Sequence, residues 1–185
     1  MVFLNRVVRA AKLDPNLYEE VEADRRAMPQ AVGVVVLSGI AAGIGALGVG
    51  GAPALIISTI GAVGGWFVWA LLTYVIGAKF FPEPQTHSDL GEMLRTIGFA
   101  SSPGFIRIFG LIPGATDIVL FVAVIWMLAA MVVAVRQALD YTSTTRAVGV
   151  CLLGWLIQLV IFVLLLRAQG IDPRTIGDLA TMDAR

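Results

Sequence analysis

Long segments without a charged side chain constrain this chain more than any other feature. Ala31 to Gly50 runs for 20 residues without Asp, Glu, Lys or Arg. An α-helix of that length crosses a hydrocarbon core about 30 Å thick, because each residue rises about 1.5 Å. Similar runs cover Ala54–Ala78, Ile118–Val135 and Ala147–Leu166. Since 58% of the residues are hydrophobic and only 14% are charged, the sequence predicts an all-α, polytopic membrane helical bundle.

A further segment, Ile97–Ala115, is long enough to cross but is interrupted. It contains Ser101-Ser102-Pro103-Gly104 and Arg107. Proline removes a backbone hydrogen bond, and an arginine in the hydrocarbon region must reach an interface or a polar partner. We expect five transmembrane helices, with four helices and a re-entrant segment as the alternative. Arg95 and Arg107, together with Gln158 of the last run, are the candidate pathway residues.

The distribution of Lys and Arg favours a cytoplasmic N-terminus, because these residues accumulate in cytoplasmic loops. With five helices, the residues on the inside would be Arg6, Arg9, Lys12, Arg25, Arg26, Lys79, Arg95, Arg136 and Arg146, against Arg107, Arg167, Arg174 and Arg185 outside. If the third segment re-enters, only Arg136 and Arg146 lie outside. Both arrangements satisfy the rule, and the length and apolarity of the third segment favour five.

Residues 1–30 form a predicted cytoplasmic, charged region before the transmembrane bundle of 31–166 and a short tail, 167–185. A helix over residues 2–13 would be amphipathic, with Arg6, Arg9 and Lys12 opposite its apolar arc. These three residues are expected to contact the membrane surface, and docking of the helix on the protein itself is the alternative. Asp14-Pro15 predicts an N-cap and a second helix to about Arg26. Its acidic residues are expected to face water: Glu19, Glu20, Glu22 and Asp24.

A polar elbow interrupts the apolar sequence between the last two runs. It extends from Arg136 through Asp140 and Tyr141 to Arg146. With five helices, it is a cytoplasmic turn between the fourth and fifth. Arg136 and Asp140 are one helical turn apart and could pair, a contact worth about 0.2–0.5 kcal/mol when exposed.

Small residues are spaced for helix packing in the first two runs. Gly39 and Gly43 are one turn apart, and so are Gly61 and Gly65. Such spacing permits close backbone approach in lipid, where the hydrophobic effect does not drive helices together. We expect these two runs to form an antiparallel hairpin.

Residue patterns for catalysis or cofactor binding are missing from the sequence. It has no phosphate-binding lysine loop, nucleophile elbow or zinc-protease motif. His87 is the only histidine and Cys151 the only cysteine, so no metal, cofactor or catalytic residue is expected. The formal net charge is zero, which gives no reason to expect nucleic acid as a partner. The spans hold no Asp or Glu except Asp117 at an edge, which counts against a proton-coupled transporter.

Several segments together resemble the bacterial branch of the Ypt-interacting protein (Yip) family. They are LDPNLYEEVEADRRAMPQA before the first run, LLTYVIGAKFF at the end of the second, RTIGFASSPG and LIPG in the third, and MVVAVRQALDYTSTTRAVGV across the elbow. The resemblance implies a five-span membrane protein with a cytoplasmic N-terminus. Eukaryotic members are associated with small prenylated GTPases and with trafficking or shaping of membranes. The N-terminal region here is much shorter than in those relatives, which counts against binding of a small GTPase.

We therefore expect a non-enzymatic integral protein, in a bacterial cytoplasmic membrane, that organises or shapes membrane or scaffolds membrane partners. The bilayer is its first partner, and membrane proteins or further copies of the chain are the next. Two alternatives remain. One is a passive channel or carrier for a small solute, with Arg107 and Gln158 on its path. The other is an accessory subunit of a larger membrane complex.

Overall fold

The computed structural model describes residues 2–168, and they form helices joined by short turns. The elements in chain order are α1 (Val2–Ala11), α2 (Pro15–Ala23), the 3-10 turn η1 (Arg25–Ala27), α3 (Met28–Gly45), α4 (Leu47–Gly50), α5 (Pro53–Tyr74), the π-helical turn η2 (Val75–Phe80), α6 (Leu90–Ala100), the 3-10 helix η3 (Ser102–Leu111), α7 (Thr116–Ala138) and α8 (Thr144–Ala168). The all-α prediction is confirmed for this part of the chain. Most of the predicted tail, 167–185, lies outside the described residues.

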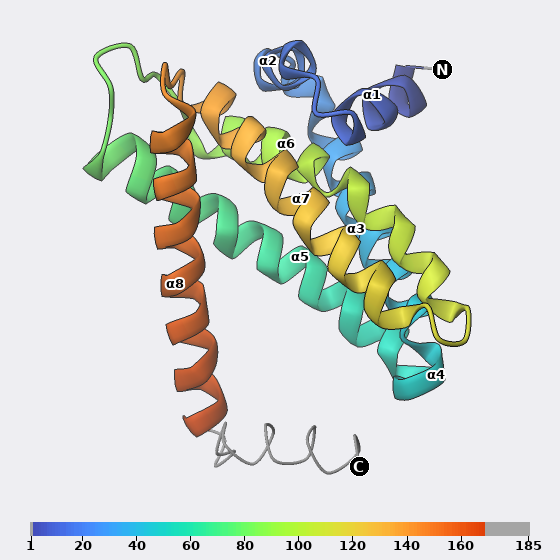
Figure 1. The fold of residues 1–185 in the computed structure, drawn as a ribbon. Helices are drawn as coiled ribbons and strands as arrows, with labels where there is room; N and C mark the ends of the chain where they lie inside the picture. Colours follow the sequence, from blue (N-terminus) through green and yellow to red (C-terminus); the bar gives the residue numbers. More distant parts are fainter. Residues whose placement is uncertain (1, 169–185) are drawn as a thin grey trace.

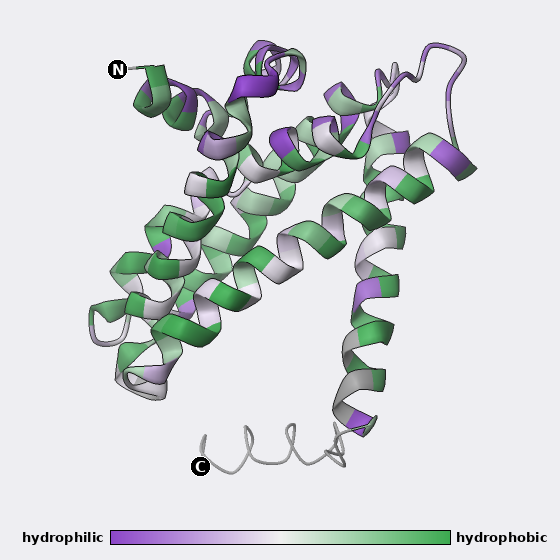
Figure 2. Ribbon diagram, turned by 180° about the vertical axis from the view of Figure 1, so that it is seen from behind, coloured by the Kyte–Doolittle hydropathy of each residue, from purple (hydrophilic) through white to green (hydrophobic). Residues whose placement is uncertain are grey.

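Four helical segments, two of which join an α-helix to a neighbouring turn, are long and apolar enough to cross a membrane. Within the described residues these are Arg25–Gly45, Pro53–Phe80, Thr116–Ala138 and Thr144–Ile161. Hydrophobic residues occupy most of the length of these helices (Figure 2). Ile57 of α5 and Phe121 of α7 are each 69% exposed. Exposed apolar side chains on this scale are expected where lipid, and not water, surrounds the protein.

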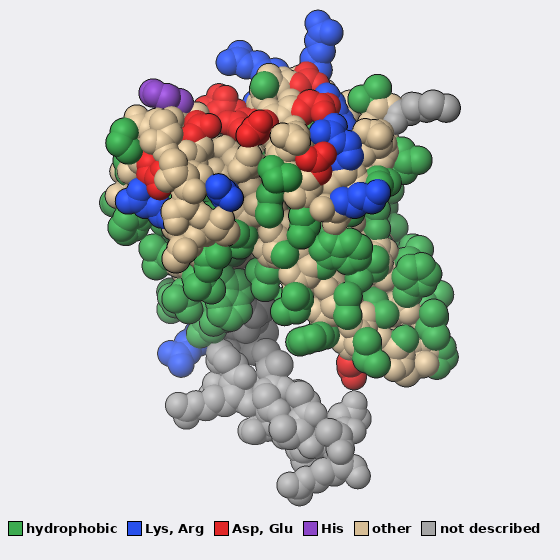
Figure 3. Space-filling view, turned by 45° about the horizontal axis from the view of Figure 1, so that its top comes forward, with side chains coloured by type: hydrophobic (Ala, Val, Ile, Leu, Met, Phe, Trp, Pro, Cys, Tyr) green, Lys and Arg blue, Asp and Glu red, His purple; other side chains and the backbone are tan. Residues whose placement is uncertain are grey.

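The polar parts of the fold gather at one end. Figure 1 shows α1 and α2, the 81–89 loop and the α7–α8 turn at that end, whereas α4 and the η3–α7 turn lie at the other. Charged side chains cover the first end (Figure 3). We call this end the polar cap, comprising α1, α2, η1, the 81–89 loop and the elbow Arg136–Arg146. The structure therefore places the elbow on the same end as the N-terminal helices.

The helix starts follow local sequence signals. Asp14 is the N-cap of α2, with its side chain accepting from the backbone N–H of Asn16, and Pro15 is the first helical residue. The predicted N-cap and proline are thus confirmed. The helix ends at Ala23 and not near Arg26, because Asp24 adopts an extended conformation and its carboxylate caps η1.

Close approach of α3 and α5 makes the predicted hairpin. A Cβ on Gly43 would lie 2.6 Å from the Cα of Leu55, and one on Gly39 would lie 2.8 Å from the Cα of Thr59. The close contact between the backbones of α3 and α5 therefore requires glycine at both positions, as the spacing predicted. Gly61 has no such neighbour within 4 Å. The second glycine pair therefore does not take part in the hairpin contact.

The interrupted third segment follows α3 along its whole length. A Cβ on Gly98 would meet Ala31, at the start of α3. Arg107 contacts Ser38 in the middle of α3, and Gly110 packs on the backbone of Gly45 at its end. The segment changes at Ser101 from α-helix to 3-10 helix, with Pro103 in the first turn of η3. It therefore runs beside α3 in the same direction, from the polar cap to the opposite end.

Candidate functional site

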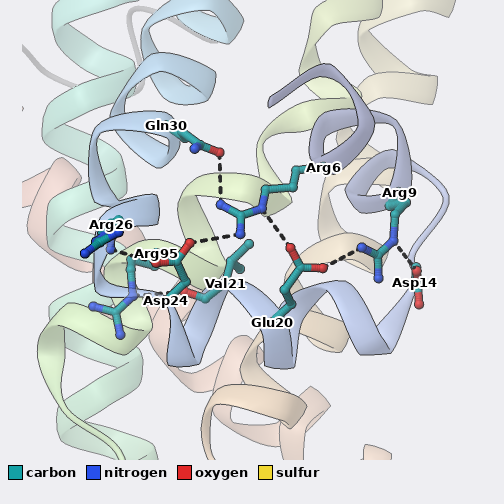
Figure 4. A network of polar contacts seen from close by, with 9 residues as sticks. All are labelled: Arg6, Arg9, Asp14, Glu20, Val21, Asp24, Arg26, Gln30 and Arg95. Carbon is teal, nitrogen blue, oxygen red and sulfur yellow. Dashed lines mark hydrogen bonds and ion pairs between the residues drawn. The ribbon is translucent and has the colours of Figure 1, made fainter. Parts of the chain in front are cut away.

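Arg6 is the centre of an ion network that fastens α1 to α2. Its Nε donates to Glu20 Oε1 at 2.8 Å, its Nη2 to Asp24 Oδ2 at 2.9 Å, and its Nη1 to Gln30 Oε1 at 3.2 Å (Figure 4). Burial opposes the charge, but the hydrogen bonds to Asp24 and Glu20 more than offset it and raise the pKa of Arg6. The guanidinium stays ionised within the protein.

Arg9 extends the same network to the end of α1. Its Nε donates to Asp14 Oδ2 at 2.8 Å and its Nη1 to Glu20 Oε2 at 2.6 Å. The structure does not place Arg6 for the expected headgroup contact, because the residue is only 8% exposed and its guanidinium is bound to Glu20, Asp24 and Gln30. Lys12 is exposed. The basic arc of α1 mainly faces the acidic face of α2, as in the alternative in which the helix docks on the protein.

Beneath this network, α2 is held by α6 and by a small core. Arg95 of α6 donates from Nε to the Val21 carbonyl at 2.9 Å and from Nη2 to the Glu22 carbonyl. A positively charged side chain that binds the last carbonyls of a helix stabilises its C-terminal end. Tyr18 is fully buried, and its hydroxyl donates to the Ala10 carbonyl at 3.1 Å. Arg95 of α6 therefore binds the cap through α2, away from Arg107.

One carboxyl group of α2 titrates differently from its neighbours. The pKa of Glu22 is raised to about 8, mainly by burial. The negative charges of Asp140, Glu92 and Glu19 raise it further, and the positive charge of Arg95 lowers it. The folded protein thus binds a proton here at pH values where an unfolded chain, with a pKa of 4.5, has lost it.

This shift predicts how stability depends on pH. The Glu22 contribution is greatest below pH 4.5 and decreases as the pH rises to about 8, because only the folded state keeps the proton in that interval. Wild-type protein in detergent should therefore melt at a higher temperature at pH 5.5 than at pH 8.5. Glu22→Gln should reduce this difference and raise the melting temperature at pH 8.5. An unchanged pH dependence in the variant would contradict the assignment to Glu22.

The elbow is clasped by Glu83 from the 81–89 loop. Glu83 Oε2 accepts from the backbone N–H and the hydroxyl of Thr142 at 3.0 and 2.9 Å, and from Gln85 at 2.6 Å. Its Oε1 lies 3.0 Å from Arg146 Nη1. The Thr142 N–H, followed by Arg146 and the Thr142 hydroxyl, lowers the pKa of Glu83 to about 2. We call these contacts the Glu83 clasp.

Two further elbow residues are held by backbone contacts. The Tyr141 hydroxyl lies 3.0 Å from the Gly77 carbonyl and 2.8 Å from the Phe81 carbonyl. Arg136 donates to the carbonyls of Tyr141 and Thr142 and to the Thr144 hydroxyl. It thus binds the elbow backbone, with no hydrogen bond or ion pair to Asp140 among the described contacts. Asp140 has a positive φ of 52°, which turns the chain out of α7.

Removing the Glu83 carboxylate should loosen this end of α8. Glu83→Ala leaves the Thr142 N–H and Arg146 without their acceptor, so we expect the melting temperature in detergent to fall by roughly 5 °C. Glu83 also keeps its charge down to about pH 2, so the clasp persists at mild acidity and is lost only as the pH falls through that value. His87→Ala, an exposed position on the same loop, is the control. Equal melting temperatures for the two variants would show that the clasp does not stabilise α8.

Away from the cap, Arg107 and Gln158 line one cavity within the bundle. This cavity has a volume of about 420 Å³ and lies among α5, η3, α7 and α8. Arg107 donates from Nε to the Gly104 carbonyl at 3.0 Å and from Nη2 to the Ser38 carbonyl and hydroxyl at 3.0 and 2.7 Å. Gln158 reaches towards α5, where a Cβ on Gly65 would be 3.9 Å from its Nε2. The two predicted pathway residues are therefore brought together, and Arg95 is not.

The contacts of Glu83, Ser38 and Trp69 are not predicted by any pattern in the sequence. Glu83 lies between two prolines in a loop, and only the fold brings it to the elbow. Ser38 is an isolated hydroxyl in the first run, and Trp69 is one of four tryptophans. No local pattern marks the partners of these residues, since each contacts a distant part of the chain.

Together, the apolar helices and the polar cap of the described residues define a polytopic helical membrane protein. A comparison with protein families matches residues 18–165 to the Yip1 domain. The chain belongs to the Yip1 family, as the resemblance in its sequence indicated. Comparison with curated proteins found no match, and comparison with solved structures found none either. Within residues 2–168, no group of three or more His, Cys, Asp or Glu side chains could hold a metal ion.

Proposed function

We propose that the chain crosses the bilayer five times, with its polar cap in the cytoplasm of a bacterial cell. The third crossing would be α6 and η3, whose path is about 36 Å long at the usual rises of the two helix types. Its contacts with α3 from Ala31 to Gly45 support this arrangement. The positive-inside rule supports the orientation, because Arg25 and Arg26 of η1, and Lys79 at the end of η2 beside the 81–89 loop, join the other basic residues of the cap end.

Within this arrangement, the protein acts without catalysis, by organising or shaping the membrane and holding membrane partners at its cap. The observation that carries this proposal is the placement of α1. Trp126 of α7 donates from Nε1 to the Ala11 carbonyl at 2.7 Å, so the C-terminal end of α1 is held against a membrane-spanning helix. Leu4 and Val8 of α1 are 68% and 43% exposed. An amphipathic helix on the cap side of the bundle that inserts such an apolar edge adds area to one leaflet only.

Vesicle reconstitution tests the shaping role. We expect the full-length protein to narrow or tubulate liposomes when viewed by electron microscopy. The double variant Leu4→Glu/Val8→Glu should lose most of this effect, because two carboxylates on the apolar edge oppose insertion into the leaflet. Asn5→Glu, an exposed position of the same helix, should behave like wild type.

Native purification tests the partner role. Crosslinking in the native membrane, followed by purification in mild detergent, should recover a reproducible partner protein or an oligomer of the chain. If a monomer with lipid alone is recovered and vesicles keep the diameter of protein-free liposomes, the proposed function is wrong.

A further inference from the structure

A groove between η2 and α8 opens at the edge of the polar cap. It is lined by Ile76, Phe81, Arg146, Gly149, Val150 and Leu153. The two elements are joined here because the Tyr141 hydroxyl contacts the Gly77 and Phe81 carbonyls, and Figure 1 shows the first turns of α8 beside the end of the helix that α5 begins. One apolar span ends at Phe80 and another begins at Thr144. The groove therefore starts at the headgroup boundary of the leaflet on the cap side, which we call the cap leaflet.

Below its mouth the groove is apolar and open to the surrounding hydrocarbon. Four of its residues share one face of α8, because they follow the helical spacing i, i+3, i+4 and i+7: Arg146, Gly149, Val150 and Leu153. Val150 and Ile76 are buried, whereas Leu153 is 38% exposed and Phe81 is 50% exposed. A Cβ on Gly149 would meet nothing within 4 Å. The space beside Gly149 is therefore free for an apolar ligand.

The size of the groove suits one hydrocarbon chain. From Arg146 to Leu153 the helix rises about 10 Å, which is about two thirds of one half of a hydrocarbon core. The volume of the groove is about 260 Å³. A helix about 10 Å wide would occupy about 800 Å³ over the same length. The groove is therefore too small to hold a helix of a partner, but part of one acyl chain can lie in it.

Arg146 lies at the mouth of the groove with unused hydrogen-bond donors. Its Nη1 is 3.0 Å from Glu83 Oε1, and its guanidinium carbon is 5.8 Å from the centre of the Tyr141 ring. These two contacts hold the guanidinium in place. Nε and Nη2 make no hydrogen bond to the described residues, and the side chain is 45% exposed. A guanidinium with two free N–H groups can bind a phosphate through both, so Arg146 complements an anionic phosphate in charge and in geometry.

We propose that this groove binds one phospholipid of the cap leaflet, with Arg146 donating from Nε and Nη2 to its phosphate and one acyl chain lying beside Gly149. The order of the two features along α8 matches the lipid, because the cation is at the headgroup boundary and the apolar groove extends from it into the hydrocarbon. An arginine without the groove would only extend among many headgroups. The binding depends neither on the compartment that holds the cap nor on the proposed shaping of the membrane by α1.

Photocrosslinking of the reconstituted full chain, with mass spectrometry of the labelled peptides, tests this site. The probe is phosphatidylglycerol with a diazirine in one acyl chain, compared with diacylglycerol that carries the same chain but no phosphate. We expect phosphatidylglycerol to label η2 and the first turns of α8 roughly tenfold more than diacylglycerol, the effect of one hydrogen bond to a charged group. Gly149→Leu should lower this labelling several times, because the new side chain fills the groove. Arg146→Gln should reduce labelling by phosphatidylglycerol to the level of diacylglycerol.

Controls separate the groove from the general lipid surface and from other occupants. Gly64→Leu adds the same side chain at an exposed position of α5, where a Cβ would also meet nothing within 4 Å, and should leave labelling of the groove unchanged. If Arg146→Gln does not fold, Gly149→Leu alone decides the outcome. Labelling unaffected by Gly149→Leu would overturn the proposal. So would displacement of the probe by soluble glycerol phosphate, which would identify a solute site, or loss of a wild-type oligomer in Gly149→Leu, which would identify a second copy of the chain as the occupant.

Discussion

Replacing Gly45 with valine is expected to separate η3 from α3 and to destabilise the protein by about 3 kcal/mol. Any Cβ at this position would overlap the backbone carbonyl of Arg107, and a backbone atom cannot rotate away as a side chain can. The shift should also disturb the contact between Arg107 and Ser38. Thermal unfolding in detergent, followed by size-exclusion chromatography, measures the loss.

Gly48→Val is the matched control for this prediction. Gly48 lies on α4, three residues further along, and a Cβ there would meet nothing within 4 Å. The substitution should cost only the lower helix propensity of valine. The free energy of unfolding should therefore stay within about 0.5 kcal/mol of the wild-type value. If the two variants unfold at the same temperature, then η3 does not pack on the end of α3.

A second large effect is expected for Gly43→Val in the α3–α5 hairpin. The added Cβ would lie 2.6 Å from the Cα of Leu55, so the two helices must move apart and lose packing along their contact. In lipid, such contacts and not the hydrophobic effect hold helices together. We expect a loss of about 2–3 kcal/mol and a shift of purified protein from a single species to aggregate.

Gly61→Val tests whether position matters for this effect. Gly61 belongs to the other glycine pair on α5, but a Cβ there would meet nothing within 4 Å. Near wild-type unfolding is therefore expected. A loss as large as that of Gly43→Val would mean that Gly61 faces a partner helix, for example in an oligomer.

The sequence was most informative where one element determines its own structure. The uncharged runs predicted the four long helices, Asp14 and Pro15 predicted the start of α2, and Gly39 and Gly43 predicted the hairpin contact. Each of these signals depends on local chain geometry or on the thickness of a bilayer. The fold class follows from them, since only a helix bundle satisfies the backbone of such apolar runs in lipid.

The candidate site depended on contacts between distant segments. The basic arc of α1 was compatible with headgroups and with an acidic protein surface, and only the position of α2 shows that Glu20 and Asp24 bind Arg6. Hydropathy could not decide the path of the third segment, because Pro103 and Arg107 occur in kinked spans and in re-entrant segments alike. Its alignment with α3 became visible only in the fold. Similarly, Glu83 gains its role from the elbow.

Cysteine labelling tests the central claim, that the third segment carries the chain from the cap end to the opposite face. Cys151 is buried, so single cysteines can be introduced at exposed positions: His87→Cys, Ser143→Cys, Gly48→Cys and Pro113→Cys. We expect a membrane-impermeant maleimide added to intact cells to label Gly48→Cys and Pro113→Cys, and to label His87→Cys and Ser143→Cys only after the membrane is opened. Labelling of Ser143→Cys in intact cells, with Pro113→Cys protected together with His87→Cys, would show that the segment re-enters and would contradict the account.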